Sequence, residues 1–165
     1  QPTPLDAAWF ARRLELAESM LKGIFYRTLE AFGRISKFPA NQFVEVPVEL
    51  LFPTPDNTYQ ICWFEIKEGE KMVVKGKLPK ARYFSFTLYN VWLESYDYTR
   101  HTISLNNKEI DADYNGTFQI TVSNKNPGHT NWLDNAGHTA GYLVARSLVP
   151  EGDTPEFDLS LTSIL

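Results

Sequence analysis

The stretch of sequence richest in reactive side chains is residues 130–146, TNWLDNAGHTAGYLVAR. His138 lies near its centre, and an imidazole can take or give a proton close to neutral pH. Such a role needs a carboxylate partner, for which Asp56, in the segment PDNTY, and Asp97 are the candidates. The sequence therefore contains the parts of a hydrolase or lyase active site, with His138 and Asp56 as the catalytic pair.

The same stretch also has a structural interpretation. Gly137 and Gly141 permit positive φ angles, and Asn131 favours a local turn. Trp132 is expected to be anchored in the core, with its indole N–H bonded to a backbone carbonyl. Arg146 is expected to pair with a buried carboxylate, as arginines inside strands often do. In this interpretation these residues are a framework that shapes a turn, and the role of His138 stays open.

A second group of candidates comes from the run ARYFSFTLYN, whose residue types alternate as in a strand. Tyr83 and Tyr89, with Ser85 and Thr87 between them, would share one face of that strand. Such a face suits a sugar or a phenol-like ligand, and it equally suits a sheet face that a helix covers or that solvent reaches. The next segment, WLESYDYTRH, adds side chains that both stack and hydrogen bond. The predicted ligand-binding residues are Tyr83, Tyr89, Trp92, Tyr96, Arg82 and Arg146.

Signatures of metal and cofactor sites are missing from the sequence. It contains no phosphate-binding loop, no dinucleotide fingerprint, no H-E-x-x-H and no G-x-S-x-G. The three histidines are not spaced like ligands on one element, so a metal site would need the fold to gather His129, Asp134 and His138. We therefore predict neither a metal nor a cofactor.

Composition narrows the classes of function. The chain has 165 residues and a formal net charge of −4, with its basic residues scattered, which argues against a nucleic-acid surface. No run of 18 apolar residues is present, so no membrane span is expected. The single cysteine, Cys62, excludes an intrachain disulfide and is expected to be a buried, inert thiol.

The elements that must position these residues divide the chain in two. In residues 1–37, apolar side chains recur at spacings of three and four, which predicts one long amphipathic helix. An apolar stripe of this length is expected to lie on a sheet or on another subunit. From residue 38 to residue 165 the pattern changes to short strands with no helices between them. We therefore predict a single domain, 1–165, in which an antiparallel β-sandwich or jelly roll follows the helix.

Eight strands are expected in this second part, separated by turn-forming segments. The segments FEIKEGEKMVVKG and IDADYNGTFQITV are predicted to be β-hairpins, because each has a turn signal between alternating runs. The expected strands are 43–48, 59–67, 71–77, 83–89, 102–105, 117–123, 142–148 and 157–161.

The order of these motifs resembles the bacterial family called domain of unknown function 1214. PDNTY, VKGKLPKARYFSFTLYN, YNGTFQITVS and NWLDNAGHTAGYLVAR carry the resemblance, which spans about Pro53 to Pro150 and leaves the N-terminal helix outside. It implies a jelly-roll-like β domain with no established reaction, often in exported or envelope proteins. A periplasmic or extracellular location is accordingly favoured over a cytoplasmic one. The matching positions are Asp56, Tyr59, Arg82, Tyr83, Tyr89, Asn131, Trp132, Gly137, His138, Gly141 and Arg146.

Three functions remain in competition on this basis. The first is a module that binds a glycan or a small aromatic or polar ligand on the tyrosine-rich face. The second is a hydrolase or lyase that uses His138 as general acid/base and Arg82 or Arg146 to bind an anion. The third is a structural subunit of an oligomer or filament, in which the helical stripe packs against a copy of the same chain. A homo-oligomer is compatible with the other two functions.

Overall fold

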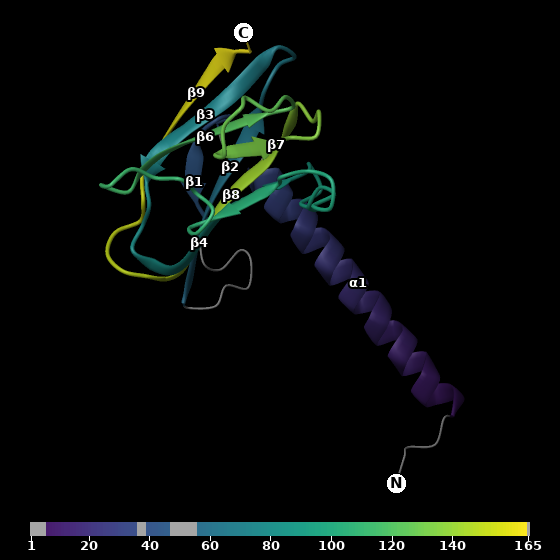
Figure 1. Ribbon diagram of the computed structural model, residues 1–165. Coiled ribbons are helices and arrows are strands. Elements are labelled where there is room, and N and C mark those ends of the chain that lie inside the picture. Colours follow the sequence, from purple (N-terminus) through teal and green to yellow (C-terminus); the bar gives the residue numbers. More distant parts are fainter. Residues whose placement is uncertain (1–5, 36–38, 47–55, 165) are drawn as a thin grey trace. The chain divides into compact units, whose positions relative to one another are not determined.

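The computed structural model describes residues 6–35, 39–46 and 56–164. The chain divides into two compact units, Gln1–Lys37 and Phe38–Leu165. The first unit contains one helix and the second contains two β-sheets, labelled by element in Figure 1. The predicted fold class, a β-sandwich preceded by a helix near the N-terminus, is confirmed.

The helix α1 runs from Ala7 to Ile35. It begins where the carboxylate of Asp6 accepts a hydrogen bond of 2.7 Å from the backbone N–H of Trp9, which caps the first turn. Three residues of the expected stripe, Phe10, Leu14 and Leu21, are 52%, 57% and 69% exposed. The partner predicted for this stripe therefore stays a prediction. None of the described helical residues forms a span long and apolar enough to cross a membrane.

One sheet of the sandwich has five strands, all paired antiparallel to their neighbours. Its central strand, β8, is the longest, and it pairs with β2 on one side and with β4 on the other. In spatial order the strands are β1 (Phe43–Glu45), β2 (Asn57–Glu65), β8 (Ala140–Pro150), β4 (Ala81–Tyr89) and β5 (Ser104–Asn106).

The second sheet has four strands and one parallel pair. That pair joins β6 to β7, a strand of three residues that was not predicted because its stretch, rich in Asn and Gly, was interpreted as a turn. In spatial order the strands are β7 (Trp132–Asp134), β6 (Thr117–Ser123), β3 (Glu70–Lys77) and β9 (Phe157–Ser163).

Both predicted hairpins are wrong, although the turns lie where they were expected. β2 and β3, joined by residues 66–69, belong to different sheets, so FEIKEGEKMVVKG connects the two layers. The turn at Asn115-Gly116 precedes β6, whose partners are β3 and β7. Stacked sheets lie only about 10 Å apart, so a short turn can cross between them as readily as it can close a hairpin.

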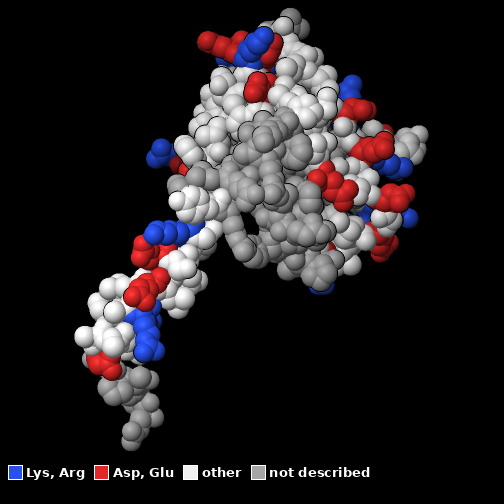
Figure 2. Space-filling model, turned by 180° about the vertical axis from the view of Figure 1, so that it is seen from behind, with Lys and Arg blue, Asp and Glu red and all other residues white. Residues whose placement is uncertain are grey.

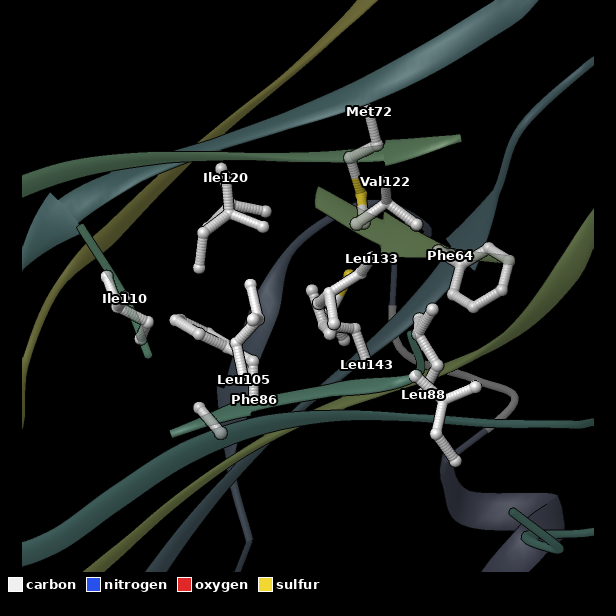
Figure 3. Packing of buried hydrophobic residues seen from close by; sticks show 14 of the residues in the cluster. Phe64, Met72, Phe86, Leu88, Leu105, Ile110, Ile120, Val122, Leu133 and Leu143 are labelled. Carbon is white, nitrogen blue, oxygen red and sulfur yellow. The ribbon is translucent and has the colours of Figure 1, made fainter. Parts of the chain in front are cut away.

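The core lies between the two sheets. Figure 3 shows Met72, Ile120 and Val122 from the four-stranded sheet facing Phe86 and Leu143 from the five-stranded sheet. These five side chains have an exposed fraction of 0%. Alternate residues of each strand point into this layer, which leaves the other residues for the two outer faces.

Cys62 lies in this core, as expected. Its thiol is free and fully buried. Burial raises its pKa to about 12, against a smaller lowering by a hydrogen bond from the backbone of Asn41. A thiol with such a pKa is almost entirely protonated at neutral pH and is therefore a poor nucleophile.

Candidate functional sites

The first candidate site lies on the outer face of the five-stranded sheet. Residues Phe84, Phe86 and Leu88 of β4 belong to the core, so the alternate residues of this strand point outward. The strand register places Arg146 of β8 between Tyr59 of β2 and Ser85 of β4. We call this surface the Arg146 face, and it comprises Tyr59, Tyr83, Ser85, Thr87, Tyr89 and Arg146.

Arg146 is held at the middle of this face by its neighbours. Its Nε donates a 2.8 Å hydrogen bond to Oδ1 of Asn57, and its guanidinium carbon lies 5.9 Å from the ring centroid of Tyr59. The side chain is exposed, and among the described residues no partner is present for its Nη groups. The acceptor is an amide rather than the buried carboxylate that we expected. The positive charge of Arg146 is therefore not neutralised by an ion pair within the described part of the chain.

The tyrosines of the face lie close enough to Arg146 to affect one another. Burial raises the pKa of Tyr89, and Tyr59 and Tyr83 raise it further, whereas the charge of Arg146 lowers it. Tyr83 and Tyr89 are about 20 Å apart along β4, at roughly 3.3 Å per residue. Both residues lie on the same side of β4 as Ser85, which is paired with Arg146 in the strand register.

The remaining predicted ligand-binding residues lie elsewhere. Trp92 is 67% exposed in the turn that follows β4. Tyr96 is only 6% exposed and belongs to the core. Arg82 is exposed and directly precedes Tyr83 in β4, so the two side chains point to opposite sides of the strand. Tyr59 was recognised only as a position that matches the family pattern, because alternation within one strand does not show which residue of the next strand lies beside it.

The second candidate site is a hollow beside His138 with a volume of about 230 Å³. The imidazole stacks on the ring of Tyr96, with 4.5 Å between the ring centroids and 6° between the ring planes. We call this cavity the His138 hollow. Its walls are the connection 66–70, Asn124, Asn135, Gly137, His138 and Thr139.

The predicted catalytic pair is not brought together. Asp56 precedes β2 at the end where that strand faces Leu148, whereas His138 precedes β8 at the opposite end, where Ala140 faces Glu65. These two ends of β2 lie about 25 Å apart at roughly 3.3 Å per residue. Asp97 instead accepts hydrogen bonds from the backbone and hydroxyl of Thr99, which lower the pKa of its carboxyl group.

The structure contains a histidine–carboxylate pair that the sequence did not reveal. Nδ1 of His101 lies 2.7 Å from Oδ2 of Asp134, whose Oδ1 accepts a hydrogen bond from the backbone of Ala136. These two residues are 33 positions apart in the sequence, so no local motif indicates the pair. A shallow hollow of about 470 Å³ lies nearby, lined by Thr102, Asn126, Gly128, His129, Thr130 and Trp132.

The gathering of His129, Asp134 and His138 that a metal would need is not observed. Asp134 pairs with His101, and Nε2 of His129 lies 3.2 Å from the hydroxyl of Thr121. Within the described residues, no three histidine, cysteine or acidic side chains lie close enough together to share a metal ion.

Two of the predicted framework residues act through hydrogen bonds. The side chain of Asn131 accepts from the backbone N–H of Asp111 and donates to its carbonyl, at 2.8 and 2.6 Å. The indole N–H of Trp132 donates to the carbonyl of Ser123 at 3.1 Å. Trp132 is only partly buried, because Leu133 is the residue of β7 that points into the core.

The two glycines have different roles. Gly137 has a φ of 78° and permits the turn, as expected. Gly141 does not have a positive φ, so our expectation for this residue is wrong. A Cβ atom there would lie 2.4 Å from the carbonyl oxygen of Tyr89 and 2.9 Å from the hydroxyl of Tyr96. Gly141 is therefore required for close packing.

Charges are mixed on one face of the molecule. Figure 2 shows acidic and basic side chains interspersed on the face in view, without a large field of one sign among the coloured residues.

Comparisons with known proteins show the fold. The chain matches no family model, and no curated protein is similar to it at a significant level. A solved structure of an uncharacterised protein from Burkholderia cenocepacia is similar, with a TM-score of 0.70 and 23% identity over 75% of this chain and 35% of that protein. The VPA0106 protein of Vibrio parahaemolyticus is also similar, with a TM-score of 0.52 and 16% identity over 96% of this chain and 47% of that one. The chain thus spans less than half the length of either protein.

Proposed function

We propose that this protein is a binding module for a small organic acid that carries a ring, such as an aromatic carboxylate or an acidic sugar. The observation that carries the proposal is the exposed guanidinium of Arg146, fixed at Nε by Asn57 and surrounded by tyrosines. The site on this proposal is the Arg146 face.

The chemistry of the face favours an anion. A guanidinium offers planar N–H donors that match the two oxygens of a carboxylate, and in Arg146 the Nε donor already has a partner that sets the orientation of the group. Phenol hydroxyls can donate further hydrogen bonds to the same oxygens. The three tyrosine rings provide apolar surface against which a ring can pack.

The proposal can be tested by titrating the protein with benzoate and with glucuronate, using calorimetry or amide NMR. Benzyl alcohol and glucose serve as uncharged counterparts of the two acids. A hydrogen bond to a charged group contributes about 1.5–3 kcal/mol, so at least one acid is expected to bind about tenfold or more tightly than its neutral counterpart. The acid that binds identifies which type of ring the tyrosines accept.

The substitution Arg146→Gln is expected to abolish this preference for the acid. Arg82→Gln is a matched control. Arg82 is an exposed arginine of the neighbouring strand β4, and alternation places its side chain on the opposite side of the strand from Tyr83 and Ser85. Equal binding of acid and neutral compound to the unmodified protein would contradict the proposal, as would a loss of binding in both variants.

Three sequence-based predictions remain as proposals beside this one. They are membership of the domain of unknown function 1214 family, an extracytoplasmic location and self-association through α1. A hydrolase or lyase based on His138 and Asp56 is not supported by the placement of the two residues at opposite ends of β2.

A further inference from the structure

The four-stranded sheet ends on one side in a long edge strand. β9 (Phe157–Ser163) pairs with β3 alone, and Figure 1 shows it in yellow at the edge of the sheet. Within the part of the chain that the structure describes, the other edge strands, β1, β5 and β7, have three residues each. Very short edge strands protect a sheet from further pairing, whereas an edge of seven residues is long enough to bind another strand.

The backbone of β9 presents hydrogen-bonding groups on its free side. The N–H of Ile164 donates to the carbonyl of Gly69 at 2.7 Å, which fixes the hydrogen-bonding phase of the two strands. In an antiparallel ladder alternate residues bond to the neighbouring strand, so the even-numbered residues of β9 bond to β3. The residues whose N–H and C=O groups point to the free side are Phe157, Leu159, Leu161 and Ser163. No described residue pairs with these outward groups.

The strand lacks the devices that usually prevent edge pairing. Its sequence, FDLSLTS, contains no proline, lysine or arginine, and its register with β3 is continuous, without a bulge. Phe157 and Leu159 pack against the core, but Leu161, on the same face of the strand, is 40% exposed. A further strand beside β9 would cover this apolar side chain.

The strand is complementary to itself when two copies run antiparallel. A pairing centred on Ser160 overlaps residues 157–163 completely with the same residues of the second copy. The free backbone groups of Leu159 then face those of Leu161 in the second copy, which gives a hydrogen-bonded pair. The side chains of this pair lie beside each other on the core-facing side of the sheet. The backbone phase and the apolar contacts therefore agree on one register.

Charges favour this direction over the parallel one. In the antiparallel register the exposed Asp158 lies beside Thr162 of the second copy, whose hydroxyl can donate to the carboxylate. On its other side Asp158 is paired with Lys75 of β3. A parallel pairing in register would instead place two Asp158 carboxylates side by side, and like charges directly opposite each other destabilise a sheet. The occupant that fits this edge best is therefore a second copy of the chain.

We propose that β9 is the interface of a two-fold symmetric dimer, in which the four-stranded sheets of two copies join edge to edge into one continuous sheet. The two-fold axis passes between the two Ser160 residues, as an isologous contact requires. This surface differs from the apolar stripe of α1. It also belongs to a different sheet from the Arg146 face, so the dimer does not depend on acid binding.

Cysteine cross-linking of the full chain tests both the pairing and its register. The two Ser160 residues form a non-hydrogen-bonded pair, in which the Cα atoms lie about 4.5 Å apart, within reach of a disulfide. Ser160→Cys is therefore expected to give a covalent dimer with oxidised glutathione, as read by non-reducing electrophoresis. Thr162→Cys is the matched control and should stay monomeric on the gel, because its two copies would lie about 13 Å apart along the strands. Cys62 is buried and does not compete.

Sedimentation velocity tests the association without a covalent bond. The unmodified protein is expected to show a dimer whose fraction rises with concentration. Leu161→Lys places an ammonium group against Leu159 of the second copy, so the dissociation constant should rise about tenfold or more. Leu21→Lys makes the same change on α1, where Leu21 is 69% exposed, and should leave the dimer unchanged.

Three outcomes would overturn the proposal. One is an unmodified protein that sediments as a monomer at every concentration. A second is cross-linking of Thr162→Cys as readily as of Ser160→Cys, which would indicate random collision or another register. The third is dissociation by Leu21→Lys and not by Leu161→Lys, which would assign the interface to α1.

Discussion

The Arg146 face and the His138 hollow differ in how the chain builds them. The face consists of alternate residues from adjacent strands, and its spacing is set by the sheet. The hollow consists of residues from two connections and one turn, held in place by the packing of the two sheets. The first surface carries the positive charge of the exposed Arg146, whereas the lining of the second includes the carboxylates of Glu68 and Glu70.

This difference shows what each kind of site demands of the sequence. A sheet face needs only the correct residue type at every second position, so local pattern indicates it. A hollow at the end of a sandwich needs residues that no local pattern connects, such as Glu70 and Asn135. Substitutions that separate the two regions therefore test whether each is built independently of the other.

The largest effect is expected at Gly141 of β8, the strand that carries Arg146 and that follows the turn of His138. In Gly141→Ala the added Cβ would meet the backbone of Tyr89 at 2.4 Å, and such overpacking costs about 3 kcal/mol in the free energy of unfolding. Both sites should be lost together. The measurement is urea unfolding, monitored through the reaction of Cys62 with a thiol reagent. This buried thiol reacts only when the sandwich opens.

Gly23→Ala serves as the control for that measurement. Gly23 lies in α1 with nothing within 4 Å of an added Cβ, so the change should leave the Cys62 reaction unaltered. A Gly141→Ala variant as stable as the unmodified protein would show that the close approach at Tyr89 relaxes without cost.

Asn57→Ala is expected to damage the Arg146 face alone. Asn57 is 9% exposed, and its removal leaves Nε of Arg146 without its acceptor, so unfolding should become easier by about 1–2 kcal/mol. Binding of an acid should weaken about tenfold, because the guanidinium loses its fixed orientation. Titration with benzoate and with glucuronate measures the effect, and unchanged affinity for both acids would show that Asn57 does not orient the guanidinium for binding.

Gly137→Ala is expected to affect only the His138 hollow. Gly137 has a φ of 78° and open space around it, so alanine adds backbone strain of about 1 kcal/mol without a clash. Gly128→Ala is the matched control, since Gly128 has a φ of 84° and also nothing within 4 Å. Both variants should lose similar stability in urea unfolding, because each places an alanine at a positive φ with open space around it; an unchanged stability in either would contradict the strain.

Tyr96→Phe should give the smallest effect, with the opposite sign. The hydroxyl of Tyr96 is buried without a partner, so its removal should stabilise the fold by about 0.5–1 kcal/mol at neutral pH. Burial also raises the pKa of Tyr96 above its unfolded value, so the folded state loses stability as the pH rises above about 10, where the unfolded phenol ionises. The variant should lose less stability in that range, as measured by urea unfolding at several pH values.

Much of the fold could be predicted from local pattern. The strand 117–123 was predicted with the bounds that β6 has, and the other expected strands overlap described strands. The tyrosines of β4 were assigned to one face correctly, because side chains alternate along any strand. β7 was missed, since the Asn and Gly residues around it favour a turn and it pairs with β6 only in the folded sheet.

The sequence by itself determined the fold class, the shared outward face of Tyr83 and Tyr89, and the burial of Cys62. These features follow from the polarity of the side chains and from the periodicity of apolar residues along the chain. Both depend only on a residue and its near neighbours in the sequence. The tertiary structure alone decided that β2 and β3 lie in different sheets, that His101 pairs with Asp134, and that His138 is far from Asp56 but close to Asn135. These depend on which strands pair, and pairing is selected by the packing of the whole core rather than by any segment of it.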